Sequence, residues 1–394
     1  MAGADNPRVC VVTGARSEYG LMRWAMEELK ARPGLDFQLV VTGAHLSDRY
    51  GQTSREVEAD GFSIDARVPA DIEHDDAPAL AAAVGRLTAG MAEAFKRLRP
   101  DLVLVMGDRY ELLAVAAACV MMTIPIAHIS GGEVSEGAID DQIRHAMTKT
   151  AHLHFASNAL HARRVLQMGE EPWRVCTSGE PGLDALHRMA RLSRAELCAD
   201  LGLDPDGPIG LVTHHPVTLT PGALAAELEA VDAAMRRAAA ERGVRFVITH
   251  PNADAGNQAI TLVWERFVAD HPGSVLVTSL GHRRYLSALA GLDFMLGNSS
   301  SGLVEAPSFN LPAVNIGERQ AGRARGSNVI DAAATEAAIS AAIGEALARD
   351  RGGAVDNPYG GDGRASARIV DFIEDAMRTR SRAELLRKRF VDLA

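Results

Sequence analysis

The chain is poor in cysteine and in positive charge, and each shortage excludes a class of protein. Its four cysteines among 394 residues form no C-x-x-C pair, which predicts buried free thiols in a reducing cytoplasm rather than a disulfide framework. The net charge of −10 disfavours nucleic acid or an anionic membrane as the main partner. A small anionic ligand is still compatible with this charge, because backbone amides and a few arginines can outweigh it locally.

The sequence also lacks an unbroken apolar run that would cross a membrane. The nearest approach is LLAVAAACVMMTIPIAHI, residues 112–129, which Pro125 interrupts and Glu111 precedes. Its length is close to that of a membrane-spanning helix, but a helix to Met122 followed by a short buried strand accounts for it better. The opening MAGADNPR has no basic region leading into an apolar core, so we expect no signal peptide and a cytoplasmic location.

What the chain does contain is a repeated alternation of strands and helices. Short Val, Ile and Leu runs such as RVCVVTG, DLVLVMG and IPIAHIS alternate with segments of helical period, and the pattern restarts with IGLVTH, RFVITH and SVLVTS. Strands buried on both faces and separated by helices predict parallel, doubly wound sheets. The sequence therefore predicts an α/β protein with two Rossmann-like domains facing across a cleft, residues 1–185 and 186–365. A C-terminal helix, residues 366–394, is expected to cross back to the first domain.

Polar or glycine-bearing loops follow nearly every predicted strand. In the first half they are GARSEYG, GAHLSDRYG, GDRYE and SGGE, and in the second half HHPVTL, HPNAD, SLGHRRY, NSSSG and GERQAGR. Open parallel sheets bind ligands at the carboxyl ends of their strands. One polar loop carries little information, but nine of them predict a ligand site in the cleft.

A serine-rich loop in the second half is the best phosphate-binding candidate. GNSSSGLVEAPSF, residues 297–309, places three serines before a helix expected to begin at Leu303. The free N–H groups of a helix start bind phosphate, and serine hydroxyls add donors; a plain serine N-cap would explain the same letters. Glu305, one turn further, suits ribose hydroxyls better than phosphate.

Cationic and imidazole side chains follow other strands. Arg319, Arg323 and Arg16 stand where a diphosphate would need cations, although any one of them taken alone is more simply a surface charge. VTHHPV places His214 and His215 at the exit of a strand, where adjacent side chains point in opposite directions. This spacing argues against a two-histidine metal site and leaves one histidine to face the cleft.

The segment HISGGEVSEGAIDDQIRHAMTKTAHLHF, residues 128–155, holds four histidines and four carboxylates. It admits a metal site, an acid/base site, or a solvated helix in which Asp140 acts as N-cap. The segment should be helical to about Thr150 and then strand. Zinc-type spacing such as H-x-x-x-H is missing, so we expect no metal. The acid/base interpretation remains, with Asp108, Glu133 and Asp140 at strand ends of the first domain.

Together these motifs resemble the hydrolysing UDP-N-acetylglucosamine 2-epimerase family. GARSEYG, VTGAHLSDRYG, MGDRYE, HISGGEVSEGAIDDQIRHAMTK, THHPVTL, HPNADAGN, GNSSSGLVEAPSF, NIGERQAGR and NPYGGDGRASARI occur in the family's order over about residues 8 to 375. The resemblance implies a glycosyltransferase-B-like fold. It also implies an enzyme that releases UDP from a UDP-N-acetylhexosamine, inverts C2 and yields the free sugar for sialic or related nonulosonic acids.

The resemblance also implies the residues that do this chemistry, with no metal or redox cofactor. Loss of the C2 proton as the C1–O bond breaks, followed by hydration of a glycal, needs more than one acid/base group. The matching catalytic positions are Asp108, Asp140 and His215. The positions that match substrate or nucleotide contacts are Arg16, His45, Arg109, Asn252, Ser299, Ser300, Glu305 and Arg319.

The chain departs from the resemblance at one position. Many relatives read H-I-E-G-G-E where this chain reads HISGGE, so a third catalytic carboxylate is replaced by Ser130. The following loop is also one residue longer. Either Glu133 supplies the missing carboxylate, which is our hypothesis, or the substrate differs near the sugar. Such variants resemble the branch that acts on UDP-2,4-diacetamido-2,4,6-trideoxyglucose, on the route to legionaminic acid.

Other functions fit part of this pattern. A non-hydrolysing 2-epimerase, a UDP-sugar glycosyltransferase and a non-catalytic UDP-sugar binder would each use similar loops, and a metal-dependent hydrolase is the weakest alternative. Relatives imply a homodimer or tetramer. The last segment, residues 378–394, lies beyond the resemblance and is either a packing helix or a basic solvated end.

Overall fold

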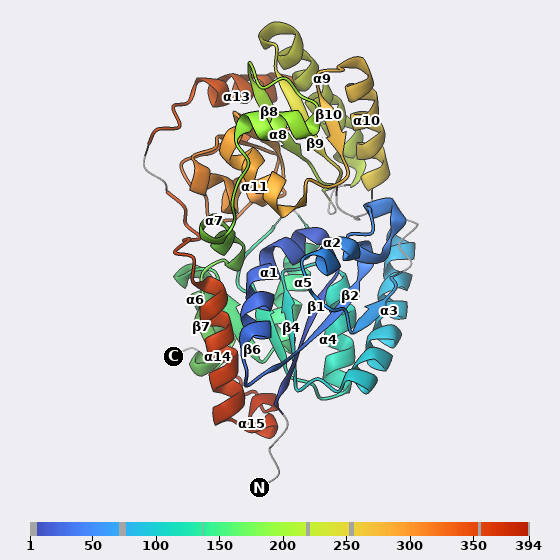
Figure 1. Ribbon diagram of the computed structural model, residues 1–394, viewed down its shortest axis with the longest axis vertical. Helices are drawn as coiled ribbons and strands as arrows, with labels where there is room; N and C mark the ends of the chain where they lie inside the picture. Colours follow the sequence, from blue (N-terminus) through green and yellow to red (C-terminus); the bar gives the residue numbers. More distant parts are fainter. Residues whose placement is uncertain are drawn as a thin grey trace. The chain divides into compact units, whose positions relative to one another are not determined.

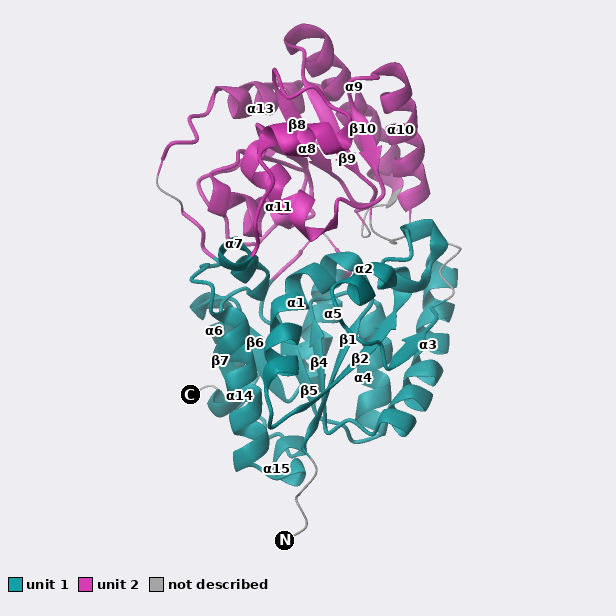
Figure 2. Ribbon diagram, viewed as in Figure 1, with its two compact units in different colours: residues 1–133, 140–188, 359–394 teal, residues 134–139, 189–358 magenta. Residues whose placement is uncertain are grey.

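The computed structural model describes residues 6–70, 76–136, 138–217, 221–251, 256–353 and 356–392, and its strands form two parallel sheets (Figure 1). The chain divides into two compact units (Figure 2). Unit 1 comprises residues 1–133, 140–188 and 359–394, and unit 2 comprises residues 134–139 and 189–358. The predicted fold class, α/β with two parallel-sheet units, is confirmed.

The sheet of unit 1 has the strand order β3-β2-β1-β4-β5-β6-β7. Its strands are β1 Arg8–Thr13, β2 Asp36–Thr42, β3 Ala66–Val68, β4 Leu102–Met106, β5 Ile126–Ile129, β6 Leu153–Ala156 and β7 Val175–Thr177. Its α-helices are α1 Arg16–Ala31, α2 Ser54–Ala59, α3 Ala77–Leu98, α4 Glu111–Met121, α5 Asp140–Thr150, α6 Ala159–Gln167, α7 Ala185–Arg188, α14 Ala365–Thr379 and α15 Arg382–Leu386. The central strands are continuously apolar because helices cover both faces of a parallel sheet; every residue of β4 is buried.

Two segments test the sequence-based elements directly. The apolar run 112–129 forms most of α4 and then β5, and residues 140–150 form α5 before β6, so both predictions are confirmed. Among the described residues, no helix is both long and apolar enough to span a bilayer. The four cysteines are free, and Cys10, Cys119 and Cys198 are buried, as expected.

The C-terminal segment completes unit 1. Helix α14 packs along α1 (Figure 1), and Ile369, Val370 and Ile373 belong to the same apolar core as β1, β2 and β4. The buried guanidinium of Arg174 then binds the C-terminal end of α15. It donates to the carbonyl oxygens of residues 384, 385 and 387 at 3.2, 2.8 and 3.1 Å. Residues 378–392 are therefore a structural part of this unit, which answers the question that the sequence left open.

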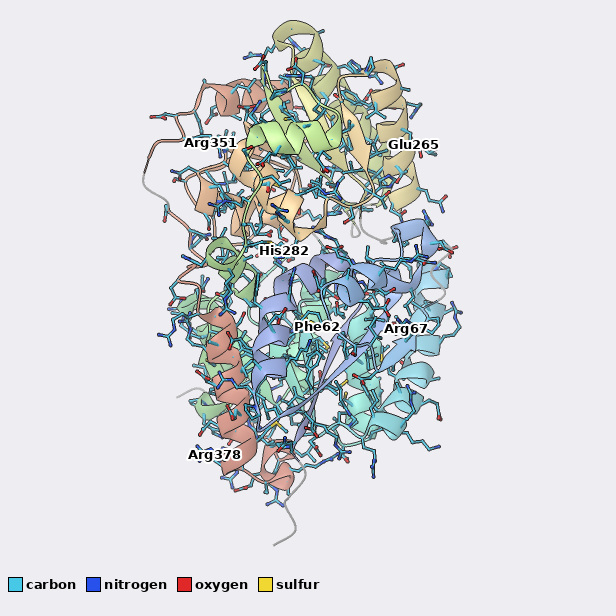
Figure 3. All side chains as sticks on the ribbon, in the orientation of Figure 1. Phe62, Arg67, Glu265, His282, Arg351 and Arg378 are labelled. Carbon is cyan, nitrogen blue, oxygen red and sulfur yellow. The ribbon has the colours of Figure 1, made fainter. Side chains whose placement is uncertain are left out.

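The sheet of unit 2 has the order β10-β9-β8-β11-β12-β13. Its strands are β8 Ile209–Thr213, β9 Arg245–Thr249, β10 Val275–Val277, β11 Phe294–Gly297, β12 Ala313–Ile316 and β13 Val329–Ala332, and its helices are α8 Arg194–Leu201, α9 Leu224–Arg242, α10 Asn257–Asp270, α11 Gly281–Gly291, α12 Ser301–Val304 and α13 Glu336–Ala348. Arg351, labelled in Figure 3, ties the end of this unit to its interior by donating to the carbonyl oxygens of Leu292 and Phe309 at 2.5 and 3.1 Å.

A short segment from the first half of the sequence also belongs to unit 2. Residues 134–136 lie against the loop after β12, where Arg323 Nε donates to the Val134 carbonyl at 3.1 Å and to Ser135 Oγ at 3.2 Å. Arg323, which the sequence suggested as a diphosphate cation, therefore holds this segment.

Candidate active site

Asp108 and Arg109 occupy the turn between β4 and α4. Gly107 adopts a left-handed φ of 85°, a conformation that glycine reaches without strain, and it ends the strand so that the next residues stand at its carboxyl end. The side chain of Asp108 is 18% exposed, whereas Arg109 is buried. Both residues therefore lie where a parallel sheet presents its ligand-binding groups.

A buried arginine that the sequence analysis missed joins two of the three predicted carboxylates. Arg144 lies on the buried face of α5 with Ile143 and Met147, and only 2% of its side chain is exposed. Its guanidinium pairs with Asp108 and, at 3.3 Å, with Glu133 Oε2. A third hydrogen bond, of 2.9 Å, goes to the carbonyl oxygen of Ser130. The signal available in the sequence was a charged residue on the apolar stripe of a helix.

Glu133 is held by hydrogen-bonding partners on both carboxylate oxygens. It is 3% exposed, and Ser157, directly after β6, donates its hydroxyl to Glu133 Oε1 at 3.2 Å. The same hydroxyl lies 2.7 Å from His161 Nδ1 on α6. With Arg144 on the other oxygen, Glu133 is a fixed, charge-paired carboxylate at the end of β5.

Asp140 is the first residue of α5 and is half-buried. It precedes Arg144 by four residues, so the two side chains share one face of the helix. The expected acidic residue at the N-terminus of this helix is thus present. Asp140 directly follows segment 134–139 in the chain.

Ser130 contacts a carboxylate that the sequence analysis did not single out. The residue has a φ of 66°, a left-handed conformation that non-glycine residues seldom adopt. Its hydroxyl donates to Glu180 Oε2 at 3.2 Å, and Ser130 and Glu180 are 5% and 4% exposed. Glu180 comes from the loop after β7, fifty residues further along the chain, so no local pattern could predict the contact.

A second group of carboxylates lies at the ends of β1 and β4. Glu18 Oε2 accepts a hydrogen bond of 2.8 Å from the Gly14 N–H, and burial, together with the nearby charge of Glu111, raises the pKa of Glu18 to about 8. Arg109 pairs with Glu111, with Nε 3.3 Å from Oε2. This group therefore holds a neutral Glu18 beside an ion pair at neutral pH.

His45 and Arg16, both predicted substrate contacts, lie next to this group. His45 is fully buried after β2, with its Nε2 3.1 Å from Thr13 Oγ1 and its Nδ1 2.8 Å from Thr53 Oγ1. Burial lowers the pKa of His45 to about 3, so the ring is neutral and can only donate or accept hydrogen bonds at physiological pH. Arg16 begins α1 and forms an ion pair with Glu56 at 3.6 Å.

In unit 2 the two adjacent histidines have different surroundings. His214 is fully buried, with its Nε2 2.9 Å from Glu227 Oε1, so it belongs to the interior of the unit. His215 follows it, and the side-chain amide of Asn298 brackets its backbone with two hydrogen bonds of 2.8 Å, one to the N–H and one to the C=O. The loops after β8 and β11 are therefore fixed to each other, and His215 is the histidine that this pairing positions.

The serine-rich loop begins at a tightly packed glycine. A Cβ added to Gly297, whose φ is 138°, would lie 2.1 Å from the carbonyl oxygen of Thr213. Ser299 and Ser300 follow and are half-buried, and α12 begins at Ser301, two residues before the expected Leu303. The helix starts earlier because the backbone N–H of Ser301 bonds to Ser299 Oγ at 3.4 Å, which turns the chain before the apolar residues begin.

The remaining predicted nucleotide contacts flank this loop, except one. Glu305 and Arg319 are each 8% exposed, and Arg319 Nη1 donates to the carbonyl oxygen of Asn298 at 3.3 Å. Asn252 lies outside the described residues. Within unit 2 the structure thus brings together Ser299, Ser300 and Arg319, and within unit 1 it brings together Asp108, Glu133 and Arg144. Within the described ranges, no group of three or more His, Cys, Asp or Glu residues could hold a metal ion.

Known proteins resemble this chain in sequence and in fold. A family model described as UDP-N-acetylglucosamine 2-epimerase matches residues 27–374. The chain is 36% identical over 367 residues to the UDP-N,N'-diacetylbacillosamine 2-epimerase (hydrolyzing) of Legionella pneumophila, covering 93% of this chain and 95% of that one. It is 35% identical over 325 residues to the GDP/UDP-N,N'-diacetylbacillosamine 2-epimerase (hydrolyzing) of Campylobacter jejuni, covering 82% and 84%.

Solved structures share the fold. The co-structure of MnaA from S. aureus with UDP superposes with a TM-score of 0.77, at 20% identity, over 95% of this chain and 98% of that one. The family model and the two relatives each cover most of the sequence, and the family match extends from residue 27, beyond Arg16, to residue 374. The chain therefore belongs to the UDP-N-acetylglucosamine 2-epimerase family of enzymes.

Proposed function

We propose that the protein is a hydrolysing 2-epimerase of UDP-2,4-diacetamido-2,4,6-trideoxyglucose, the sugar nucleotide also called UDP-N,N'-diacetylbacillosamine. The activity removes UDP, adds water and releases the 2-epimeric free sugar. The observation that carries the proposal is the buried group at the ends of β4 and β5, in which Arg144 holds Asp108 and Glu133. Two relatives at 36% and 35% identity have this activity in their names, which supports the choice of sugar.

The reaction requires proton transfers at one carbon and charge stabilisation at the leaving group. As the C1–O bond to UDP breaks, positive charge develops at C1 and makes the C2 proton more acidic, so a carboxylate is a sufficient base. Asp108 and Asp140 are the proposed acid/base pair. Glu133 is the third proposed acid/base carboxylate, and its pairing with Arg144 fixes it near Asp108, which the same guanidinium holds.

Unit 2 supplies groups suited to the nucleotide. Ser299, Ser300 and Arg319 are the proposed diphosphate contacts, since hydroxyls and a guanidinium stabilise the charge that the departing phosphate gains. Glu305 would accept hydrogen bonds from ribose hydroxyls, and His215 would donate one to the leaving diphosphate. Asn252 is proposed here from its motif alone.

Residues that follow β1, β2 and β4 supply neutral and cationic contacts in unit 1. His45 is uncharged because of its burial, so we assign it a hydrogen-bonding role rather than a proton transfer. Arg16 and Arg109 are the proposed cations on this side. Their partners Glu56 and Glu111 limit how far each guanidinium can turn, which favours a fixed ligand position.

UDP-N-acetylglucosamine is the alternative substrate, because the family model carries that name. The test is to incubate the protein separately with each of the two nucleotide sugars, measuring UDP release and identifying the free sugar by proton NMR. We expect UDP release and C2 epimerisation with the diacetamido sugar at the higher kcat/KM, with deuterium at C2 when the reaction runs in D2O. Asp108→Asn should abolish both UDP release and C2 epimerisation.

Several outcomes would contradict the proposal. An epimer still attached to UDP would identify a non-hydrolysing epimerase, and UDP release only with a sugar acceptor would identify a glycosyltransferase. Binding of both nucleotide sugars without UDP release or C2 exchange would identify a non-catalytic binder. A higher kcat/KM with UDP-N-acetylglucosamine would keep the reaction type and replace the substrate.

We also propose that the protein is a cytoplasmic homo-oligomer that associates through α4. Leu113, Val120 and Met121 are 37%, 42% and 79% exposed on this helix, and exposed apolar groups gathered on one face mark association surfaces. The four free cysteines support the reducing compartment. Light scattering after gel filtration should show a dimer or tetramer that Met121→Glu dissociates; a monomeric wild-type protein would contradict the proposal.

A further inference from the structure

The pair Ser130–Glu180 is a part of the acidic group in unit 1 that the proposed function leaves unused. Ser130 reaches the group through its backbone, because its carbonyl oxygen accepts the 2.9 Å hydrogen bond from Arg144. Its hydroxyl points to Glu180 Oε2 at 3.2 Å. Ser130 thus contacts both Glu180 and the guanidinium of Arg144, and that guanidinium holds Asp108 and Glu133.

The burial of Glu180 calls for an explanation. Only 4% of the residue is exposed, and carboxylates are rarely buried this far unless their pairing or their function compensates the lost hydration. The hydroxyl of Ser130 orients one oxygen of the carboxylate. Glu133 is already fixed by Arg144 and Ser157 on its two oxygens, and Glu180 is the carboxylate of this group that the Ser130 hydroxyl contacts.

We propose that Glu180 is an acid/base carboxylate of the 2-epimerase reaction, held in place by the Ser130 hydroxyl; this inference rests on the proposed function. The protonated Glu180 gives the proton that forms the new C2–H bond, and the electron pair comes from the C1–C2 double bond of the glycal. Water then bonds to the cationic C1, and its surplus proton passes to the Glu180 carboxylate. The group ends as it began, and no other reactant is consumed.

The geometry makes a specific exchange of residues testable. In a glutamate at position 130, a carboxylate oxygen would lie about 2.4 Å beyond the place of Ser130 Oγ, from standard bond lengths and angles. Ser130 Oγ and Glu180 Oε2 are 3.2 Å apart. A glutamate at 130 with an alanine at 180 would therefore place a carboxylate close to where Glu180 now holds one.

The experiment measures UDP release and C2 proton exchange for Glu180→Gln, Glu180→Ala and the double variant Ser130→Glu/Glu180→Ala. General acid/base catalysis typically contributes about 10²- to 10⁴-fold, so we expect Glu180→Gln to lower kcat by that factor with a much smaller change in KM. We expect the double variant to exceed Glu180→Ala by at least about tenfold in kcat, with a changed pH profile, because a carboxylate has been restored.

The matched control is Glu170→Gln. Glu170 is a carboxylate of the same unit whose side chain is fully buried, and it pairs with Lys149 at 2.6 Å and with Lys388 at 2.8 Å, outside the proposed site. It should lower the unfolding temperature and leave kcat within about threefold of wild type, which separates loss of a buried carboxylate from loss of an acid/base group. Circular dichroism of every variant confirms that it is folded.

The outcomes separate the two proposals. If the wild-type protein is active and folded Glu180→Gln keeps kcat within about threefold, this inference is overturned alone. A double variant no more active than Glu180→Ala, although it is folded and binds UDP, also overturns it. A wild-type protein that releases no UDP from either nucleotide sugar overturns the proposed function as well.

Discussion

Replacing Glu18 by glutamine should change how the stability of unit 1 depends on pH. Burial, with the charge of Glu111 next to it, raises the pKa of Glu18 to about 8, against 4.5 for an ordinary glutamate. Below pH 4.5 both the folded and the unfolded chain carry the proton. Between pH 4.5 and about 8 only the folded chain keeps it, so the unfolded state is increasingly favoured as the pH rises.

The size of the effect follows from the difference between the two pKa values. Each pH unit in this window lowers the free energy of unfolding by about 1.4 kcal/mol, or about 5 kcal/mol over the whole window. Glutamine keeps an oxygen that can accept the hydrogen bond from the Gly14 N–H but does not titrate. The stability of Glu18→Gln relative to wild type should therefore rise by about 4 kcal/mol between pH 5 and pH 8.

The assay is urea unfolding followed by tryptophan fluorescence at pH 5, 6, 7 and 8. Trp24 and Trp173 belong to unit 1 and Trp264 to unit 2, so both proteins carry Trp264→Phe and the signal reports on unit 1. The matched control is Ser17→Ala on the same helix turn, which removes no titrating group and should show a difference that is constant with pH. A Glu18→Gln difference that is also constant would refute the reasoning.

Other substitutions test the contacts that build the two units. Arg144→Leu leaves Asp108 and Glu133 without their shared cation. We expect the free energy of unfolding to fall by about 3–5 kcal/mol and UDP release to be lost. An active variant with wild-type stability would show that Arg144 is not part of the site. Gly297→Ala brings a methyl group within 2.1 Å of the Thr213 carbonyl oxygen. Unit 2 should therefore unfold at a lower urea concentration, and the decrease should exceed that of an ordinary glycine-to-alanine change. An unchanged urea midpoint, measured by the fluorescence of Trp264, would contradict the described packing. Arg174→Met removes the donor to the carbonyl oxygens of residues 384, 385 and 387. The backbone amides of residues 382–392 should therefore exchange faster with deuterium. Unchanged exchange there would show that other contacts hold the segment.

The sequence was sufficient for the architecture, because alternation of apolar and helical segments is a local property. It placed α4, β5 and α5 within a few residues, and it correctly divided the run 112–129 into a helix and a strand. The start of α12 was wrong by two residues, at Ser301 rather than Leu303. A hydrogen bond from the Ser301 N–H to a serine hydroxyl decides that boundary, and apolar periodicity carries no information about such a bond.

Individual side chains of the site were found where strand ends pointed to them, and missed where a contact joins distant segments. Asp108 and Glu133 lie in the loops that follow β4 and β5, so the parallel-sheet rule located them. Arg144 was missed because a charged residue on an apolar helix face looks like an error in the pattern until its two carboxylates are seen. Glu180 could not be foreseen, since β6 lies between β5 and β7 in the sheet and only the fold brings its side chain to Ser130.

The return of the C-terminal segment to unit 1 affects the order in which the molecule can be made. A ribosome delivers residues 189–358, which hold the second sheet, before it delivers α14, whose Ile369, Val370 and Ile373 finish the core around the first. Until then the apolar side of α1 that α14 will cover is open to chaperones, proteases and other nascent chains. Truncated genes that end before residue 359 should therefore yield aggregating protein, and an isolated first unit would need residues 1–188 joined directly to 359–392.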